Sequence, residues 1–140
     1  EMMSVACSNV LLPSVHFDKD KFNIKPEFYA HLHVLASKMA DCPDLIIRAT
    51  GMTDKDDNQK YNEQLSWNRS NAVIDYLTEK YGINRDRFIV KFSGESNAEG
   101  SSNIEQYKER KVSLEQADAD EVGESNPAPP HPGLKAGTND

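Results

Sequence analysis

The chain has 140 residues, of which 37% are hydrophobic, and this is enough apolar material for one core with flanking segments. Its formal net charge of -7 at pH 7 argues against a nucleic-acid partner, because general nucleic-acid binding relies on clustered Lys and Arg. No apolar run approaches the length of a membrane span. The sequence begins with Glu1 rather than Met, so we expect a piece of a longer polypeptide, with membrane contact made only through parts absent here.

The first half of the chain predicts a strand, a helix and a second strand. Residues 10–17 form a strand that Pro13 confines to a sheet edge or shortens at its start. Pro26 then opens a helix, because proline is favoured in the first turn, and the apolar stripe of this helix is Phe28, Leu32, Leu35, Met39 and Cys42. Residues 45–50 make a short apolar strand.

The second half predicts one long helix and two strands. The helix runs from about residue 58 to residue 81 and is ended by Gly82. Residues 87–92 and 110–115 alternate in polarity as strands do. The resulting β-α-β-α-β-β order predicts an α/β fold, a two-layer sandwich in which helices pack on a mixed parallel and antiparallel sheet.

The last part of the chain differs in composition from the rest. Residues 117–140 are acidic and rich in proline, a composition that cannot bury a core. We therefore expect one domain over residues 1–116, with its core from about residue 10, followed by a tail over residues 117–140. The sequence leaves open whether the tail packs on its own domain or on a neighbouring molecule.

The two cysteines are placed where they can meet. Cys7 precedes the first strand and Cys42 ends the first helix. A helix that runs back along the strand it follows brings its C-terminus to the place where that strand began. We therefore expect a Cys7–Cys42 disulfide, which would indicate an oxidising compartment such as the periplasm. Two unpaired, partly buried thiols are the alternative.

One arginine interrupts the apolar stripe of the second helix. At helical spacing the inward series is Tyr61, Leu65, Arg69, Val73, Tyr76 and Leu77. Asn62 and Ser66 lie within about 60° of Arg69 around the helix. A guanidinium in such a place needs an anionic partner, because an unpaired buried charge is costly. Asp54, which follows the glycine turn at Gly51, places a carboxylate at the same cleft.

Other chemistry has less support in the sequence. Asp54, Asp56 and Asp57 lack the glycine and glutamate of a calcium-binding loop. His31 and His33 point about 200° apart on a helix, so they cannot share a metal ion there. No residue stands in a nucleophile motif. We therefore expect no metal, no cofactor and no enzymatic activity.

Several separated motifs occur along the chain in a fixed order. They are Gly51-x-Thr53-Asp54, Tyr61-Asn62-x-x-Leu65-Ser66-x-x-Arg69, Val73-x-x-Tyr76-Leu77 and Tyr81-Gly82-Ile83. In this order they resemble the OmpA C-terminal-like family of peptidoglycan-binding domains, and the similarity extends from roughly residue 15 to residue 114.

The resemblance implies a set of ligand-binding residues. In the family, the residues that match Asp54 and Arg69 hold the ammonium and the carboxylate of meso-diaminopimelate, a residue of the peptidoglycan stem peptide. Thr53 and Asn62 would then fix the orientation of this ligand. The remaining expected site residues are Asp18, at the rim of the cleft, and Arg110, as a second cation.

Two departures from the family pattern affect this cleft. Met52 stands where the family usually carries an aromatic residue or a histidine. Glu109 and Lys111 flank Arg110 in place of an asparagine and an arginine. The carboxylate of Glu109 would weaken the positive potential around Arg110.

The resemblance implies a non-catalytic module that binds peptidoglycan and tethers the outer membrane, or a larger envelope protein, to the cell wall. Such a module lies at the periplasmic face of the outer membrane of a Gram-negative bacterium. The residues themselves leave an alternative open, in which Arg69 and Asp54 pair only with each other. The chain would then be a structural or protein-interaction domain of the envelope with a degenerate ligand cleft.

Overall fold

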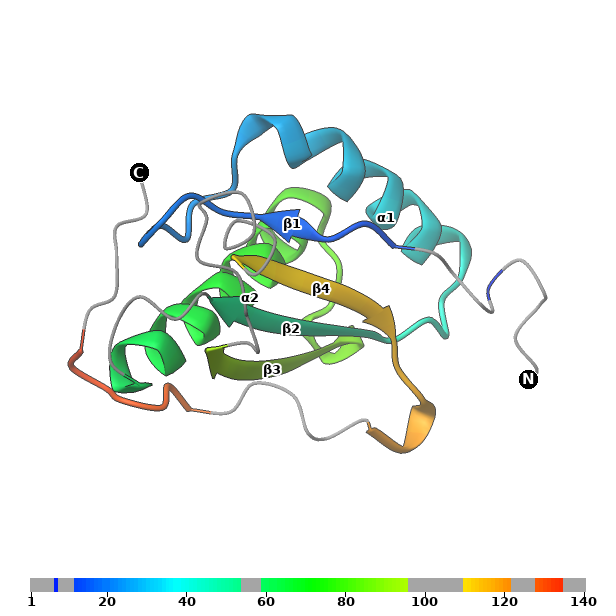
Figure 1. Ribbon diagram of the computed structural model, residues 1–140. Helices are drawn as coiled ribbons and strands as arrows, with labels where there is room; N and C mark the ends of the chain where they lie inside the picture. The colour runs from blue at the N-terminus through cyan, green and yellow to red at the C-terminus, as the bar shows by residue number, and fades with distance from the viewer. Residues whose placement is uncertain (1–6, 8–11, 54–58, 96–109, 122–127, 135–140) are drawn as a thin grey trace.

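The protein folds as an open four-stranded sheet with two α-helices packed on it (Figure 1). The computed structural model describes residues 7, 12–53, 59–95, 110–121 and 128–134. The strands are β1 (Val15–His16), β2 (Ile47–Thr53), β3 (Phe88–Glu95) and β4 (Lys111–Gln116). The α-helices are α1 (Tyr29–Asp41) and α2 (Gln59–Tyr81), and single 3-10 turns form η2 (Pro26–Phe28), η3 (Arg85–Arg87) and η4 (Ala119–Glu121). The predicted α/β sandwich is confirmed.

The sheet has the strand order β1-β4-β2-β3 and contains both kinds of pairing. β2 and β3 are parallel, which the crossover through α2 makes possible, and Ile47 pairs with Phe88. β4 is antiparallel to both of its neighbours, so Val112 lies opposite Gly51 of β2 and Val15 of β1. The first strand therefore pairs with the last one, and β2 lies inside the sheet.

The first strand and the first helix differ in form from the prediction, and β2 and β3 extend to Thr53 and Glu95 rather than to residues 50 and 92. Only Val15 and His16 are paired in β1, although residues 10–17 were expected to form the strand. Pro13 has no N–H group to donate to a ladder, and it lies two residues before the start of the short paired segment. The helix that Pro26 opens begins with the 3-10 turn η2 before it becomes α-helical.

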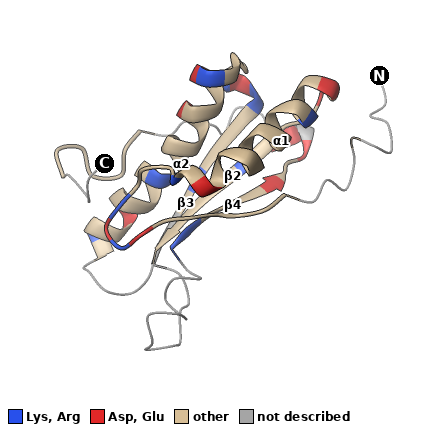
Figure 2. Cartoon of the chain, turned by 90° about the horizontal axis from the view of Figure 1, so that it is seen from above, with Lys and Arg blue, Asp and Glu red and all other residues tan. Residues whose placement is uncertain are grey.

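The core lies between the helices and one face of the sheet. Along β2 every second residue is buried, from Ile47 to Thr53, as a half-covered strand requires. The helices bury apolar side chains against this face, namely Leu32, Leu35, Ala36 and Met39 from α1 and Leu65, Val73, Ile74 and Leu77 from α2. Figure 2 shows charged residues of both signs scattered along the two helices.

Helix α2 approaches strand β2 closely at one point. A Cβ atom on Gly51 would overlap the backbone of Ser66, whose carbonyl carbon would lie only 2.7 Å away. One turn further along α2, the Ser70 hydroxyl donates a hydrogen bond of 2.6 Å to the carbonyl oxygen of Ala49. These small residues let the helix lie against the strand, so that Arg69 reaches the C-terminal end of β2.

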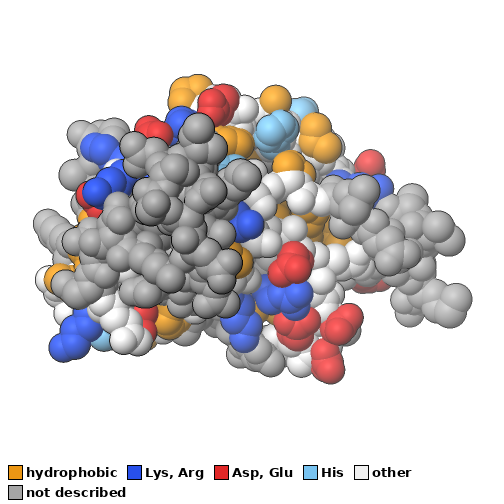
Figure 3. Space-filling view, viewed as in Figure 1, with side chains coloured by type: hydrophobic (Ala, Val, Ile, Leu, Met, Phe, Trp, Pro, Cys, Tyr) orange, Lys and Arg blue, Asp and Glu red, His pale blue; other side chains and the backbone are white. Residues whose placement is uncertain are grey.

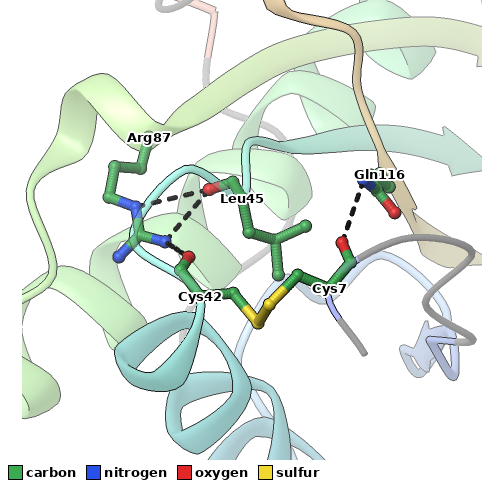
Figure 4. Close-up of a disulfide and its surroundings, with 5 residues drawn as sticks. All are labelled: Cys7, Cys42, Leu45, Arg87 and Gln116. Atoms are coloured by element: carbon green, nitrogen blue, oxygen red, sulfur yellow. Dashed lines mark hydrogen bonds between the residues drawn. A yellow bond between two sulfur atoms is a disulfide. The ribbon is translucent and has the colours of Figure 1, made fainter. Parts of the chain in front are cut away.

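A disulfide joins Cys7 to Cys42, as predicted, with a Cα–Cα distance of 5.7 Å (Figure 4). Cys42 caps the end of α1, where its N–H donates to the carbonyl oxygen of Lys38. Arg87 Nη2 donates to the carbonyl oxygens of Cys42 at 2.6 Å and Leu45 at 3.1 Å. On the other side of the bridge, Gln116 Nε2 donates to the carbonyl oxygen of Cys7 at 3.2 Å. The disulfide therefore lies where the end of α1, the turn η3 and strand β4 meet.

The sheet face opposite the helices carries a fixed ion pair. Arg48 Nη1 donates to both carboxylate oxygens of Glu121, at 2.7 and 2.8 Å, which anchors η4 to β2. The hydrogen bond from Arg48 lowers the pKa of Glu121 below its ordinary value. Figure 3 shows acidic and basic side chains side by side on this face. None of the helices in the described ranges is long and apolar enough to cross a bilayer.

Candidate functional site

Arg69 is fully buried and donates hydrogen bonds to three backbone carbonyl oxygens. Its Nε donates to Lys21 at 2.8 Å, its Nη2 to Asp18 at 3.0 Å, and its Nη1 to Met52 at 3.0 Å. The first two acceptors belong to the segment after β1, and the third belongs to β2. Arg69 thus connects two segments that are distant in sequence, and these contacts fix the plane of its guanidinium.

The carbonyl oxygen of Met52 lies where the β2–β3 ladder is irregular. The register between the two strands shifts by one residue between Gly51 and Thr53. Such a shift interrupts the regular exchange of backbone hydrogen bonds, and irregularities of this kind are frequent near functional sites. Here the irregularity coincides with the bond from Arg69.

The segment from Asp18 to Lys21, which follows β1 and is called the β1 turn below, forms a tight turn. Lys21 N–H donates to the carbonyl oxygen of Asp18 at 3.1 Å, and Asp20 adopts a positive φ of 62°. The hydroxyl of Tyr61 donates to the carboxylate of Asp20 at 2.9 Å. Arg69 therefore holds the backbone of the turn, and Tyr61 holds one of its side chains. Neither Asp20 nor Lys21 was expected to contribute to the site. Asp20 contributes through an unusual backbone conformation, and Lys21 contributes through a backbone oxygen, which every residue type offers.

The side chain of Asp18 pairs with Lys25. Its carboxylate forms an ion pair with Lys25 at 3.1 Å and is 62% exposed, while its backbone carbonyl accepts the hydrogen bond from Arg69. Asp18 is therefore available at the surface of the turn, next to Lys25.

Arg110 and Arg69 meet around Phe17. The Arg69 guanidinium lies 5.3 Å from the centre of the Phe17 ring, in a cation–π contact. Arg110 Nε lies 3.4 Å from the carbonyl oxygen of the same residue, and Phe17 N–H donates to the carbonyl oxygen of Arg110 at 2.8 Å. The structure thus brings together two of the cations that the sequence selected.

Thr53 and Asn62 are each 1% exposed, so two neutral polar side chains are buried at the end of β2 and in the first turns of α2. Thr53 directly follows Met52, which binds Arg69, and Asn62 lies two helical turns before Arg69. Asp54 lies outside the described residues, as do Asp56 and Asp57, for which no calcium site was expected.

One group of acidic residues has the spacing of metal ligands in the described part of the chain. Oxygen atoms of Asp118, Asp120 and Glu121 lie within 4.8 Å of one another. The carboxylate of Glu121 already accepts two bonds from Arg48 and one from the N–H of Asp118. These contacts explain why Glu121 lies where it does: it anchors η4 to β2 and needs no metal ion for this role.

A short segment of the C-terminal tail packs against α2. His131 Nε2 lies 2.7 Å from Glu63 Oε1, and the N–H of His131 donates to Gln64 Oε1 at 3.2 Å. Of the alternatives left open by the sequence, residues 128–134 therefore pack on their own domain. Two hydrogen bonds lower the pKa of Glu63 below its ordinary value of 4.5, and the bond with His131 has a larger effect than the bond from Gln59.

We expect the lowered pKa of Glu63 to control this contact. The ionised carboxylate of Glu63 is the form that accepts these hydrogen bonds. Its contribution to the docking of residues 128–134 is therefore complete above the ordinary pKa of a glutamate, and it is lost as the pH falls through the lowered pKa of Glu63. In His131→Ala, the pKa of Glu63 should rise towards 4.5, while His33→Ala, a control on α1, should leave it unchanged. NMR titration of the Glu63 carboxyl carbon measures both. An unchanged pKa in His131→Ala would contradict the contact.

The chain matches the model of the OmpA family over residues 16–119. It is 38% identical to outer membrane porin F of Pseudomonas aeruginosa over 82 residues, which cover 59% of this chain and 23% of that protein. It is 34% identical to outer membrane protein A of Escherichia fergusonii over 102 residues, covering 71% of this chain and 42% of that protein. The chain thus spans less than half the length of these relatives.

Solved structures share the fold. The peptidoglycan-associated lipoprotein from Burkholderia pseudomallei superposes with a TM-score of 0.71 at 24% identity, covering 74% of this chain and 89% of that one. The C-terminal domain of Helicobacter pylori MotB superposes with a TM-score of 0.67 at 20% identity, covering 80% of this chain and 90% of that one.

Proposed function

Because the chain belongs to the OmpA family, whose OmpA-like domains are known for association with peptidoglycan, we propose that it binds the peptidoglycan stem peptide through meso-diaminopimelate. Relatives in this family are structural envelope proteins rather than enzymes, and the proposed binding is non-catalytic. The module would tether the outer membrane, or an envelope protein, to the cell wall from the periplasmic side. The Cys7–Cys42 disulfide supports this oxidising location.

The observation that carries the proposal is the way Arg69 is held. Three backbone carbonyl oxygens accept its hydrogen bonds and fix the plane of the guanidinium. A guanidinium whose orientation is fixed in advance loses less conformational entropy when it binds a carboxylate. Its planar set of N–H donors also suits the two oxygens of a carboxylate. Arg69 would therefore receive the carboxylate of diaminopimelate.

The remaining residues would complete the recognition of a zwitterion. Asp54, which directly follows β2 in the sequence, would accept hydrogen bonds from the ligand ammonium. Thr53 and Asn62, both buried beside this end of β2, would fix the orientation of the ligand. Asp18 would lie at the rim, and Arg110, beside Phe17, would add a second cation.

A second candidate function follows from the burial of Arg69. With no exposed surface and three contacts that join the β1 turn to β2, Arg69 could serve the fold alone. The chain would then be a structural or protein-interaction domain of the envelope. The two functions differ in what they require of a ligand.

We expect binding to need both charges of the ligand. Acetylating the amine should remove the Asp54 contact and amidating the carboxylate should remove the Arg69 contact. Each change should weaken binding by about tenfold or more, because a charge-assisted hydrogen bond is worth at least about 1.5 kcal/mol. Calorimetric titration with free diaminopimelate and with the two blocked derivatives measures these differences.

Variants of the protein provide the matching controls. Asp54→Asn keeps the size of the side chain and should lose affinity for diaminopimelate, whereas Arg48→Ala removes an arginine from the opposite sheet face and should bind like the wild type. Equal affinity for all three ligands would favour the structural domain over the peptidoglycan binder. Retention of each variant on purified peptidoglycan extends the comparison to the whole polymer.

A further inference from the structure

A shallow pocket of about 150 Å³ lies on the side of α2 next to the β1 turn. It is lined by Phe22, Trp67, Asn68, Asn71, Ala72 and Asp75. This is more space than a single water molecule needs, so the pocket has room for part of a small polar ligand. None of these residues was expected from the sequence to bind a ligand.

The lining combines two aromatic side chains with polar groups whose orientation is fixed. Asn68 Oδ1 accepts a hydrogen bond of 2.8 Å from Gln64, which orients the Asn68 amide. Arg85 donates to Asp75 at 2.6 Å and also to Asn71, so the acidic group in the lining is already paired with a cation. The pocket therefore offers aromatic surface and hydrogen-bonding groups.

This combination suits a sugar ring better than an ion or an apolar side chain. The C–H face of a pyranose packs on aromatic rings such as Trp67 and Phe22, and its hydroxyl and acetamido groups bond to amides and carboxylates such as Asn68 and Asp75. A purely apolar ligand would cover Asn68 and Asp75 without offering them any further hydrogen bond. A small anion would meet Arg85 only as a cation that is already engaged with Asp75.

The pocket adjoins the Arg69 site. Phe22 directly follows Lys21, whose carbonyl oxygen accepts the hydrogen bond from Arg69 Nε. Around α2, Ala72 lies about 60° and Asn68 about 100° from Arg69. In peptidoglycan, diaminopimelate and the sugar that carries the stem peptide belong to one covalent polymer. Two neighbouring places on the protein can therefore contact parts of the same ligand.

We propose that this pocket binds an N-acetylated sugar ring of the peptidoglycan glycan strand. The inference rests on the proposed function, because it assigns a second part of the same ligand to a neighbouring place on the protein. The stem peptide would supply the charges that Arg69 and Asp54 recognise, and the sugar would supply the surface that Trp67 and Phe22 cover. The module would then distinguish wall polymer from free peptide.

Tryptophan fluorescence tests the pocket directly, because Trp67 is the single tryptophan of the chain. The probes are an N-acetylglucosamine oligosaccharide without peptide and free diaminopimelate. We expect the oligosaccharide to change the fluorescence in a saturable way. Ala72→Leu, which fills the pocket with a residue that favours helix, should abolish this change and leave diaminopimelate binding intact.

Binding of a complete muropeptide provides the second measurement. Trp67→Ala should weaken it by roughly three- to tenfold, the range of an aromatic packing contact. Trp67→Tyr should restore most of the loss, and Tyr29→Ala, a 40% exposed aromatic on α1, should have no effect. Because Trp67 also packs against the core, the pocket-filling variant decides the matter if Trp67→Ala does not fold.

The outcomes separate the two proposals. If diaminopimelate binds but the oligosaccharide causes no change, or the same change in Ala72→Leu, the sugar pocket is wrong and the proposed function stands. If the oligosaccharide binds as expected and diaminopimelate does not, the assignment of Arg69 and Asp54 is wrong and the pocket stands.

Discussion

Replacing Arg69 with alanine is expected to lower the free energy of unfolding by about 3 to 5 kcal/mol and to abolish binding of diaminopimelate. The substitution leaves the carbonyl oxygens of Asp18, Lys21 and Met52 without their donor, and each buried group that loses its partner costs about 1 to 3 kcal/mol. Water entering the vacated space would satisfy some of them, which keeps the total below the sum. The β1 turn would lose its main attachment to β2.

Urea unfolding followed by circular dichroism measures the loss of stability. Arg69→Lys keeps the charge but cannot reach three separate acceptors with one ammonium group in the same geometry, so we expect an intermediate loss of stability. Arg85→Ala is the control, because Arg85 belongs to an exposed ion pair, and it should change stability by less than about 1 kcal/mol. Binding is compared at temperatures where each variant remains folded. A loss below 1 kcal/mol in Arg69→Ala would contradict the structural part of its role.

Replacing both cysteines with serine is expected to lower the free energy of unfolding by about 3 to 4 kcal/mol. The bridge closes a loop with a sequence separation of 35 residues, and the chain-entropy model gives a stabilisation of this size. Both cysteines are buried, at 8% and 2% exposure, so the serine hydroxyls would also enter an apolar environment.

Intact mass with and without reductant first establishes the bridge, since its reduction adds two hydrogen atoms and exposes two thiols to alkylation. Unfolding of the wild type in reductant should then match unfolding of the double serine variant without it. Lys38→Ala, on α1 near Cys42 but outside the bridge, serves as the control. Oxidised protein that carries two alkylatable thiols would show that Cys7 and Cys42 are not joined.

The sequence predicts the architecture well because its signals are local. The apolar stripe of the first helix and the short apolar run at residues 45–50 depend on residues a few positions apart, and the structure has both elements. The placement of Cys7 and Cys42 follows from the order of one strand and one helix. The burial of Arg69 could also be predicted, since the residue occupies an apolar position of α2.

The contacts of the site could not be predicted in the same way. Arg69 binds the carbonyl oxygens of Asp18, Lys21 and Met52, and every residue type offers such an oxygen. The pairing of His131 with Glu63 joins residues 68 positions apart with no shared periodicity. Both depend on how distant segments meet, which composition and spacing do not encode.

The disulfide also determines how the domain would transmit mechanical force. A pull on the chain before Cys7 would pass through the sulfur atoms to Cys42, which leads directly into β2. β2 is flanked by β4 and β3, whereas the two-residue strand β1 lies at the edge of the sheet and pairs with β4 alone. The covalent bridge therefore bypasses the strand that would peel away first and directs the force into the middle of the sheet. A domain built in this way would resist stretching in the oxidised form and yield much earlier once reduced.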